Sequence, residues 1–349
     1  TTAQAAAITS KQAPALQSND IAALSPKAFA ALTPAAIGVL TDTTGVSQQI
    51  QAITVDQAKL MTTAQTKALL GAQIDSLSTD AFAALSPAAI AAISSTAIDD
   101  VTATAFGGLT AAQVAALTPA QFSKLNDANS SLSMFTATQA AAITSAQIKQ
   151  LDSTEIDALT SEAAAALTPA ALAAISSTAF FKLDKDAFAA FTPAQVAALT
   201  PAQLSVLDNS GVGAAASASA GQIASFGAAQ AAALTAKQVA SIAAADAANF
   251  SQDAFSALTP AAFSAIGFDS LSATQMGYVS SAQAASLSSK QINKLTSDKI
   301  ATLSSDAVAG LTPTALKGLA TVTAANTANQ SSAISGFTTE AAGVLTTAQ

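Results

Sequence analysis

Large apolar residues recur along this chain at two positions of an eight-residue unit, three residues apart. The unit at residues 118–125 reads Thr-Pro-Ala-Gln-Phe-Ser-Lys-Leu. We call such a unit an octad. Its consensus is Ser or Thr at position 1, Pro, Ser or Ala at position 2, any residue at position 3, Ala or Gln at position 4, a large apolar residue at position 5, two small residues, and Leu or Ile at position 8. The frame holds over residues 54–125 and 136–207, with shorter runs at 1–40, 227–266 and 272–319 and a solitary octad at 338–345.

Each octad position suits one place in a short helix. Ser or Thr at position 1 is a preferred N-cap residue, and Pro at position 2 occupies the first helical position, where its missing N–H costs nothing. Gln at position 4 completes a capping box with position 1. Positions 5 and 8 lie on one face of a helix. The pattern therefore predicts that every octad begins its own helix and carries its own buried stripe. The position-4 glutamines include Gln113, Gln121, Gln147, Gln195 and Gln203.

One continuous helix and a β-solenoid are both disfavoured by the spacing. At about 100° per residue, eight residues advance about 800°, so an apolar stripe of this period would wind around a single helix. The recurrent prolines would also break such a helix. Inward-facing strands need period-two alternation and β-branched residues, whereas the apolar spacing here is three. We expect a short helix of about one and a half to two turns in each octad, followed by a sharp bend.

The predicted fold is all-α: a repeat solenoid of short helices, one minihelix per octad, continuous over residues 1–349. A helix this short is unstable alone, so stability must come from stacked neighbours. Positions 5 and 8 are expected to form one continuous core in a coil of either hand. Examples are Phe82, Ile90, Ile98, Phe106, Val114 and Phe122 at position 5, and Leu85, Ile93, Val101, Leu109, Leu117 and Leu125 at position 8.

The octad frame is interrupted by irregular insertions rich in Gly, Asn, Ser and Asp, residues that mark turns and loops. Two interpretations stay open: loop decoration, or recurrent contact points for a partner chain or the next subunit. The insertions lie at 41–53, 126–135, 208–226, 267–271 and 320–337.

Neither end of the sequence carries a polar cap of the kind that keeps solenoids soluble. Thr1 begins in phase with the octads, and Gln349 lies at position 4 of one. We expect either a piece of a longer array or copies that stack end to end.

Composition narrows the possible functions. Charged residues make up 10% of the chain, against roughly 25% in a typical domain. Cys, His, Trp and Arg are absent, and all thirteen basic residues are Lys. This removes the usual zinc, haem and iron–sulfur ligands and the bidentate phosphate clamps of Arg. The net charge of −8 disfavours nucleic acid and anionic lipid. No stretch resembles a membrane span.

The few carboxylates suggest caps or solvated side chains. Asp152 and Asp184 stand at position 1, where an acid can cap a helix. Asp99 and Asp100 occupy positions 6 and 7 of one octad. Calcium ligation is the alternative, although neither an EF-hand loop nor the glycine-rich calcium-binding nonapeptide occurs. Ser is abundant, but it has no His partner and no Ser-x-x-Lys motif. We therefore predict no catalytic, cofactor-binding or metal-binding residue, and not an enzyme.

Three short matches to the N-glycosylation triplet begin at Asn129, Asn249 and Asn329. Two lie in insertions, where a glycan would be tolerated. Asn249 lies at position 7 of a regular octad, where a chance match is the default interpretation.

Two resemblances are visible in the repeated phrases. The phrase Phe-Thr-Pro-Ala-Gln-Val-Ala-Ala-Leu at 191–199 is similar to the opening of the DNA-reading repeats of transcription activator-like effectors. Those repeats are much longer and basic, so we interpret the match as shared helix-start chemistry. The tandem Ala-Leu-Thr-x-Ala-Gln-Ile/Val phrases at 109–117, 136–151 and 191–207 resemble the long repeat regions of giant secreted, adhesin-like or hemolysin-like surface proteins of Gram-negative bacteria. That resemblance implies export, an extracellular or cell-surface location, and a role in attachment, sheath or surface-layer formation.

We therefore expect a structural protein that self-associates into a homopolymer such as a filament, sheath or surface layer, with a surface rich in Ser, Thr, Ala and Gln. The alternative is an adhesin stalk or binding module that presents or recognises a glycan or protein at the cell surface. A sugar-binding platform would show exposed aromatic residues, and the single Tyr278, with most Phe at position 5, argues against it. No cofactor, nucleic acid partner or membrane insertion is expected.

Overall fold

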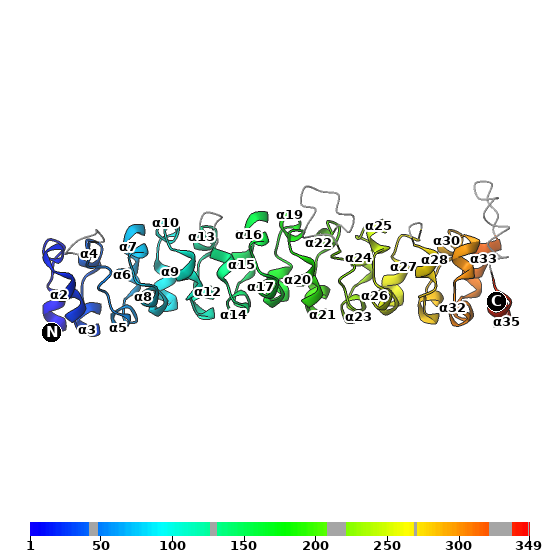
Figure 1. Ribbon diagram of the computed structural model, residues 1–349, viewed down its shortest axis with the longest axis horizontal. Helices are drawn as coiled ribbons and strands as arrows, with labels where there is room; N and C mark the ends of the chain where they lie inside the picture. The colour runs from blue at the N-terminus through cyan, green and yellow to red at the C-terminus, as the bar shows by residue number, and fades with distance from the viewer. Residues whose placement is uncertain (42–47, 126–130, 208–220, 269–270, 321–336, 348) are drawn as a thin grey trace. The chain divides into compact units, whose positions relative to one another are not determined.

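The chain forms two compact units, Thr1–Ile175 and Ser176–Gln349, each a stack of short helices (Figure 1). The computed structural model describes residues 1–41, 48–125, 131–207, 221–268, 271–320, 337–347 and 349. In these residues the secondary structure is helical, and the prediction of an all-α repeat of short helices is confirmed. The same octad frame runs through both units.

The helices of the first unit follow one another at octad spacing. They are α1 (Thr2–Ala6), η1 (Ala13–Ala15), α2 (Ser18–Ala23), α3 (Pro26–Ala30), α4 (Pro34–Ile37), α5 (Val55–Ala58), α6 (Thr63–Lys67), α7 (Gly71–Asp75), α8 (Thr79–Ala84), α9 (Pro87–Ala92), α10 (Ser95–Ile98), α11 (Ala103–Gly107), α12 (Ala111–Ala116), α13 (Pro119–Phe122), η2 (Ser131–Met134), α14 (Ala137–Ala140), α15 (Ser145–Ile148), α16 (Ser153–Asp157), α17 (Ser161–Ala166) and α18 (Pro169–Leu172).

The second unit continues the series. Its helices are α19 (Ser177–Phe180), α20 (Lys185–Ala190), α21 (Pro193–Ala198), α22 (Pro201–Leu204), α23 (Ala228–Ala232), α24 (Ala236–Val239), α25 (Ala244–Ala247), α26 (Gln252–Ala257), α27 (Pro260–Ser264), α28 (Ala273–Met276), α29 (Ser281–Ala285), α30 (Ser289–Ile292), α31 (Ser297–Ala301), α32 (Ser305–Gly310), α33 (Pro313–Ala320) and α35 (Thr339–Gly343). Apart from the eight residues of α33, the α-helices are mostly a little shorter than the expected one and a half to two turns.

The predicted capping chemistry determines where each helix begins and ends. Thr118 is the N-cap of α13, and its hydroxyl accepts a hydrogen bond from the backbone N–H of Gln121 at 3.2 Å. Pro119 fills the first helical position. The bend between octads comes from two extended residues in a row, position 8 of one octad and position 1 of the next. Leu117 has φ −55° and ψ 131°, and Thr118 has φ −70° and ψ 154°.

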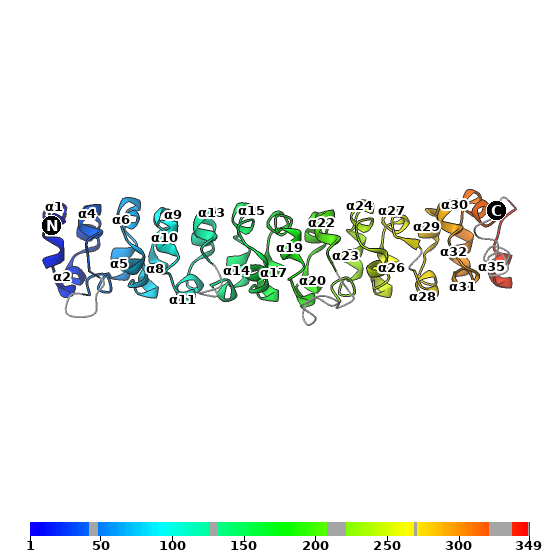
Figure 2. The ribbon, with the colours of Figure 1, turned by 90° about the horizontal axis from the view of Figure 1, so that it is seen from above.

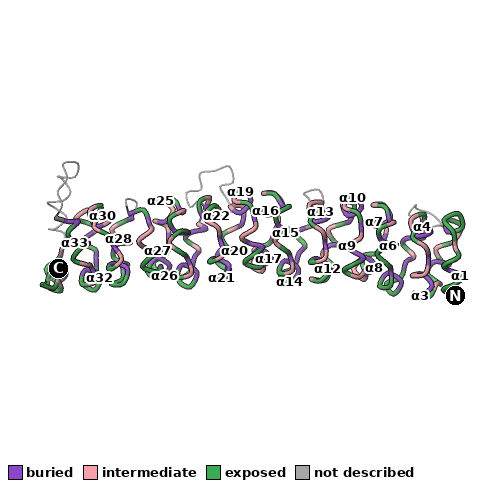
Figure 3. Tube along the Cα trace, turned by 180° about the vertical axis from the view of Figure 1, so that it is seen from behind, coloured by how far each residue is buried: buried purple, intermediate pink, exposed green. Residues whose placement is uncertain are grey.

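Three positions of each octad face the interior. Positions 5 and 8 are buried as predicted: Phe82 is 1% exposed and Leu117 is 3% exposed. Position 4 is buried beside them in most octads, whether it holds Ala, as at Ala81, or Gln, as at Gln121. The remaining positions are exposed or half-buried, so buried and exposed segments alternate along the tube of each unit (Figure 3).

The helices stack with a constant offset of three octads. In the first unit α6 packs on α9, and α9 packs on α12; in the second unit α23 packs on α26, and α29 packs on α32. Both ribbon views show the short helices of one turn beside those of the next (Figures 1 and 2). Each helix is therefore covered by neighbours that lie three octads before it and three octads after it.

Interruptions of the sequence frame still keep the second half of an octad. In residues 41–53, the backbone N–H of Ile50 donates to the carbonyl of Thr41 at 3.2 Å, the bond that position 5 makes to position 1 in a regular octad. Ile50 and Ile53 are buried, as positions 5 and 8 should be. This interruption is thus an octad with five extra residues between positions 1 and 4. The corresponding buried pairs elsewhere are Leu132 with Phe135, Ile223 with Phe226, and Phe268 with Leu271. Residues 321–336 of the last interruption lie outside the described residues.

Leu117→Asp tests the octad core. Asp at this position places a charge among apolar side chains, and the loss of a buried Leu alone costs about 2–5 kcal/mol. We expect a lower thermal unfolding midpoint by circular dichroism and faster amide exchange in residues 110–125. The matched control is Leu60→Asp, because Leu60 occupies exposed position 7 and is 45% exposed. Equal midpoints for Leu117→Asp and the parent chain would remove position 8 from the core.

Candidate functional site

The most distinctive side chains of this fold are buried glutamines at position 4. Gln57 is 0% exposed, and Gln121, Gln147 and Gln203 are each 1% exposed. The expectation that Gln would enrich the surface is therefore wrong for position 4. Buried amide groups need hydrogen-bond partners, so the bonds of these side chains identify their role.

Each position-4 amide joins two turns of the coil. The Oε1 atom of Gln121 accepts the backbone N–H of Thr118 at 2.7 Å, which closes the capping box of its own octad. Its Nε2 group donates to two backbone carbonyls of an earlier octad, at 2.8 Å to Ile90 and 2.7 Å to Ile93. Gln147 repeats the pattern, with 2.7 Å to Val114 and 2.8 Å to Leu117. One side chain thus caps a helix N-terminus and satisfies carbonyls at the C-terminal end of another.

The acceptor carbonyls belong to the octad four places earlier, with each interruption counted as one octad. Since the helices themselves pack three octads apart, one turn of the coil takes between three and four octads. Within the first unit the Nε2 groups that make this bond belong to Gln49, Gln57, Gln65, Gln73, Gln113, Gln121, Gln139 and Gln147. Within the second unit they belong to Gln222, Gln230, Gln238, Gln275, Gln283, Gln291 and Gln349. We call this set the glutamine ladder.

Some octads carry a residue other than Gln at position 4, and that residue keeps only one of the two functions of the amide, donor or acceptor. Lys299 keeps the donor half, because its Nζ lies 3.5 Å from the carbonyl of Phe268, four octads earlier. Glu155 keeps the acceptor half, because its Oε2 accepts the backbone N–H of Asp152 at 2.6 Å. Asp20 does the same for Gln17 at 2.9 Å. The neutral amide of Gln supplies both the acceptor and the donor, whereas the charged Lys299 and Glu155 supply only one each.

The Oε1 atom of Gln222 is buried and has no hydrogen-bond partner among the described residues. Its Nε2 group still donates to the carbonyl of Leu183 at 2.7 Å. In the other ladder octads Oε1 accepts from the position-1 N–H. Position 1 of this octad is Asp208, which lies outside the described residues.

Octads with Ala at position 4 rely on larger apolar side chains. Phe82 and Phe106 lie three octads apart and meet edge-on, with ring centroids 6.2 Å apart. Phe226 bridges two turns, with centroids 6.0 Å from Phe188 and 6.3 Å from Phe250. Such pairs add about 0.5–1.5 kcal/mol beyond area burial. Turns are therefore joined by apolar contacts, to which some octads add ring pairs and the ladder octads add an amide.

The two octad types occur in blocks of unequal length. Each block opens with a pair of Ala-type octads, the second with Pro at position 2. Two further Ala-type octads follow the second and third pairs, at 94–109 and 176–191, before octads with Gln at position 4 begin. These pairs begin at Ser25, Ser78, Thr160, Ser251 and Ser304. The eight-residue frame hides this order, but the choice of Ala or Gln at position 4, read down the chain, makes it visible.

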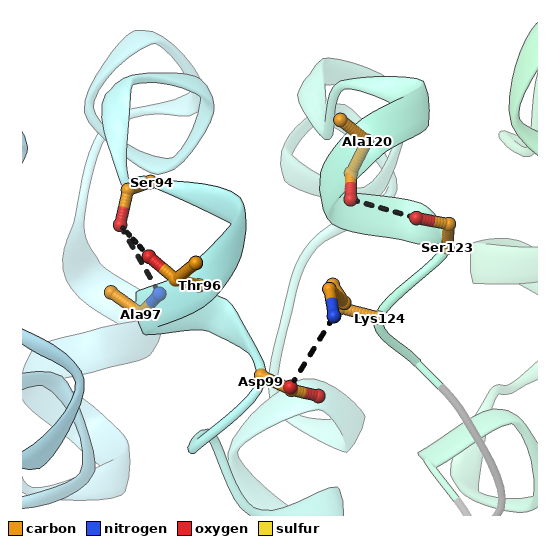
Figure 4. Close-up of polar contacts among 7 residues, drawn as sticks. All are labelled: Ser94, Thr96, Ala97, Asp99, Ala120, Ser123 and Lys124. Atoms are coloured by element: carbon orange, nitrogen blue, oxygen red, sulfur yellow. Dashed lines mark hydrogen bonds and ion pairs between the residues drawn. The ribbon is translucent and has the colours of Figure 1, made fainter.

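The four carboxylates that the sequence analysis singled out lie in three different environments. Asp152 and Asp184 are N-caps, as predicted: Asp152 Oδ1 accepts the N–H of Thr154 at 2.7 Å, and Asp184 Oδ1 accepts that of Ala187 at 2.7 Å. Asp99 forms a 3.6 Å ion pair with Lys124, three octads later (Figure 4). Its neighbour Asp100 lies instead beside an earlier octad, close to Gly71, which is three octads before it. The Asp99 and Asp100 carboxylates therefore face different turns.

Exposed polar groups around this ion pair mostly serve their own octads. Ser94 caps α10 by accepting the N–H of Ala97 at 3.1 Å, and Ser123 donates to the carbonyl of Ala120 at 3.0 Å (Figure 4). Elsewhere, a side-chain hydrogen bond to Asp186 raises the pKa of Lys185. Lys185 is fully exposed, so this contact is a solvated pair with little effect on stability.

Of the three glycosylation triplets, the one that begins at Asn249 lies inside the described residues, whereas Asn129 and Asn329 lie outside them. Its Nδ2 group donates to the carbonyl of Ala245 at 3.1 Å. Ser251, the third residue of the triplet, is the N-cap of α26 and accepts the N–H of Ala254 at 3.3 Å. Both polar side chains are therefore engaged within the helical stack.

The described residues lack two further features. Among them no group of three or more His, Cys, Asp or Glu side chains is placed to hold a metal ion. In the same part of the chain no helix has the length and apolarity needed to cross a bilayer.

No known protein family matches the chain, and no curated protein is similar enough to count as a relative. The resemblance to secreted surface proteins therefore stays a prediction. What the geometry itself displays is a repeated interface between turns.

Gln121→Glu tests the ladder. One carboxylate oxygen can still accept the N–H of Thr118, as Glu155 does for Asp152, but the other oxygen is an acceptor placed opposite the carbonyls of Ile90 and Ile93. We expect a loss of about 1–3 kcal/mol at neutral pH. Burial beside carbonyl oxygens raises the pKa of the introduced carboxyl, so the loss should shrink as the pH falls and the protonated acid regains a donor.

The measurement is thermal unfolding of Gln121→Glu across pH values from neutral to acidic. Gln150→Glu is the control, because Gln150 is exposed and its amide bonds only within its own octad, to Ala146. If the two variants unfolded alike at every pH, the ladder bond would have no energetic weight.

Proposed function

We propose that this chain is a structural, non-enzymatic repeat protein that self-associates into an extended extracellular assembly such as a filament, sheath or surface layer. The observation that carries the proposal is the turn-on-turn interface. The same amide-to-carbonyl bonds and the same apolar positions 5 and 8 join the turns throughout each unit. Such an interface needs nothing beyond more octads to continue.

The chemistry of this interface suits indefinite repetition. The acceptors are backbone carbonyls, which every residue carries, so one turn does not need a particular sequence in the next. The donors are uncharged amides, so stacking accumulates no charge. Each ladder bond also depends on the capping box of its own octad, which couples helix formation to stacking and favours a stiff, cooperative array.

The lateral surface is consistent with close association. The ion pairs Lys59–Asp56, Lys124–Asp99 and Lys185–Asp186 are all solvent-exposed, and such pairs contribute little to stability. The net charge of −8 is spread over 349 residues, and a low charge density opposes self-association only weakly. The extracellular location rests on the resemblance of the Ala-Leu-Thr-x-Ala-Gln phrases to secreted bacterial surface proteins.

Self-association is tested by sedimentation velocity across a wide range of concentrations, with electron microscopy of the same samples. We expect a distribution that shifts to larger species as concentration rises, with fibres or ordered sheets in the images. A single monomeric species at every concentration would contradict the proposal.

A further inference from the structure

Two opposite charges recur ten octads apart on the surface of the first unit. Lys67 and Lys149 occupy position 6 of their octads, and Asp75 and Asp157 occupy position 6 of the octads that follow. In most other octads this position holds a small residue. In both places the lysine therefore precedes the aspartate by one octad.

Ten octads take three turns of the coil in this unit. The helix pair α6 and α9 and the helix pair α13 and α15 each pack three octads apart. These four helices follow one another along the upper edge of Figure 2, with a step of four octads between α9 and α13. In Figure 1 the helices α7, α10, α13 and α16 follow one another along the upper edge in the same way. The two lysines, on α6 and directly after α15, therefore lie on one side of the coil, and the two aspartates, on α7 and α16, lie on another.

These four side chains have no partner within the described part of the chain. All four are exposed, and none forms an ion pair or a side-chain hydrogen bond there, in contrast to Lys59 with Asp56. We call Lys67 and Lys149 the lysine side, and Asp75 and Asp157 the aspartate side.

The local structure gives no reason for the aspartates. Asp75 and Asp157 are the last residues of α7 and α16. The carbonyl groups at the end of a helix carry partial negative charge and disfavour a carboxylate there. Two carboxylates at the same unfavourable position, three turns apart, indicate a role outside their own helices.

A third recurrent charge has a local role. Asp80 and Glu162 are also ten octads apart, at position 3 of their octads. Both lie in the first turn of a helix, α8 and α17, where the N–H groups of the helix start favour an acid. Their recurrence follows from helix chemistry, so it does not compete with the aspartate side.

We propose that the lysine side of one copy binds the aspartate side of a second copy, so that coils associate laterally. The proposal rests on the proposed function and specifies one interface of the assembly. Because the lysines and the aspartates are both ten octads apart, the two lysines of one copy can meet the two aspartates of the next at the same time. Two ion pairs at a matched spacing also define the axial register of the contact.

The arrangement of the charges selects a heterologous contact. Successive octads are rotated by about a third of a turn, so the lysine side and the aspartate side face different directions. Two lysine sides repel each other, as do two aspartate sides. A copy that binds through its lysine side leaves its aspartate side open, and further copies can add. The partner that fits is therefore another copy of this chain, in an assembly larger than a symmetric dimer.

The test uses two charge-reversal variants of the 349-residue chain. Lys67→Glu combined with Lys149→Glu makes both sides acidic, and Asp75→Lys combined with Asp157→Lys makes both sides basic. Circular dichroism confirms that each variant is folded. Sedimentation velocity gives the concentration at half-assembly for each variant, for an equimolar mixture of the two, and for the parent chain.

The matched control for the acidic variant combines Lys237→Glu and Lys290→Glu. Both lysines are exposed residues of the second unit, and the change in net charge is the same. We expect this control to assemble like the parent chain.

We expect each charge-reversal variant alone to raise the concentration at half-assembly about tenfold or more, because attraction at two pairs becomes repulsion. The mixture should assemble at about the concentration of the parent chain, since the acidic sides of one variant meet the basic sides of the other. Added salt should weaken assembly of the parent chain by screening these exposed charges.

Three outcomes would overturn the interface. If the parent chain assembles and both variants assemble equally well, the lysine and aspartate sides do not meet, and self-association through another surface stands. If each variant assembles poorly and the mixture does not recover, the two sides are not each other's partners. If the parent chain stays monomeric at every concentration, both this interface and the proposed function fail.

Discussion

The structure depends on side chains that accept a hydrogen bond from one helix and donate hydrogen bonds to another. A position-4 amide accepts an N–H at the start of its own helix and donates to carbonyls four octads earlier, as Gln121 does for Thr118, Ile90 and Ile93. Helices of four to six residues leave most of their terminal N–H and C=O groups without intrahelical partners. The amide satisfies both kinds of orphan group at once. That is why such short helices persist in a buried environment.

Where the amide is missing, bulk takes its place. Ala at position 4 lets the turns approach, and apolar side chains such as the rings of Phe82 and Phe106 fill the space between them. The blocks of Ala-type and ladder octads thus alternate two solutions to one problem, apolar contact and directed hydrogen bonding. The directed bonds specify register, since an amide must meet a carbonyl, whereas apolar contacts tolerate small shifts.

The features of the octad that depend on contacts within eight residues could be predicted from the sequence. The features that depend on contacts between turns could not. Caps such as Thr118 and Asp184, the buried positions 5 and 8, and the absence of one long helix all follow from contacts within eight residues. The burial of Gln121 does not, because it depends on how many octads complete a turn. A usable signal was present: Gln shares position 4 with Ala, next to a large apolar residue, which is an interior position. Residues 41–53 look like a break in the sequence because the position-1 cap, Thr41, is separated from the buried positions, Ile50 and Ile53, by the extra residues.

The extra residues of that interruption enter between Thr41 and Gln49, and the octad still closes through the Gln49 amide, 2.8 Å from the Thr41 N–H. Longer connections cost little additional closure entropy, so this point in the octad separates chain length from the geometry of the stack. The connection between positions 1 and 4 of this octad can therefore vary in length. A peptide inserted between Thr41 and Gln49 would lengthen this connection while the octads before and after it keep their packing.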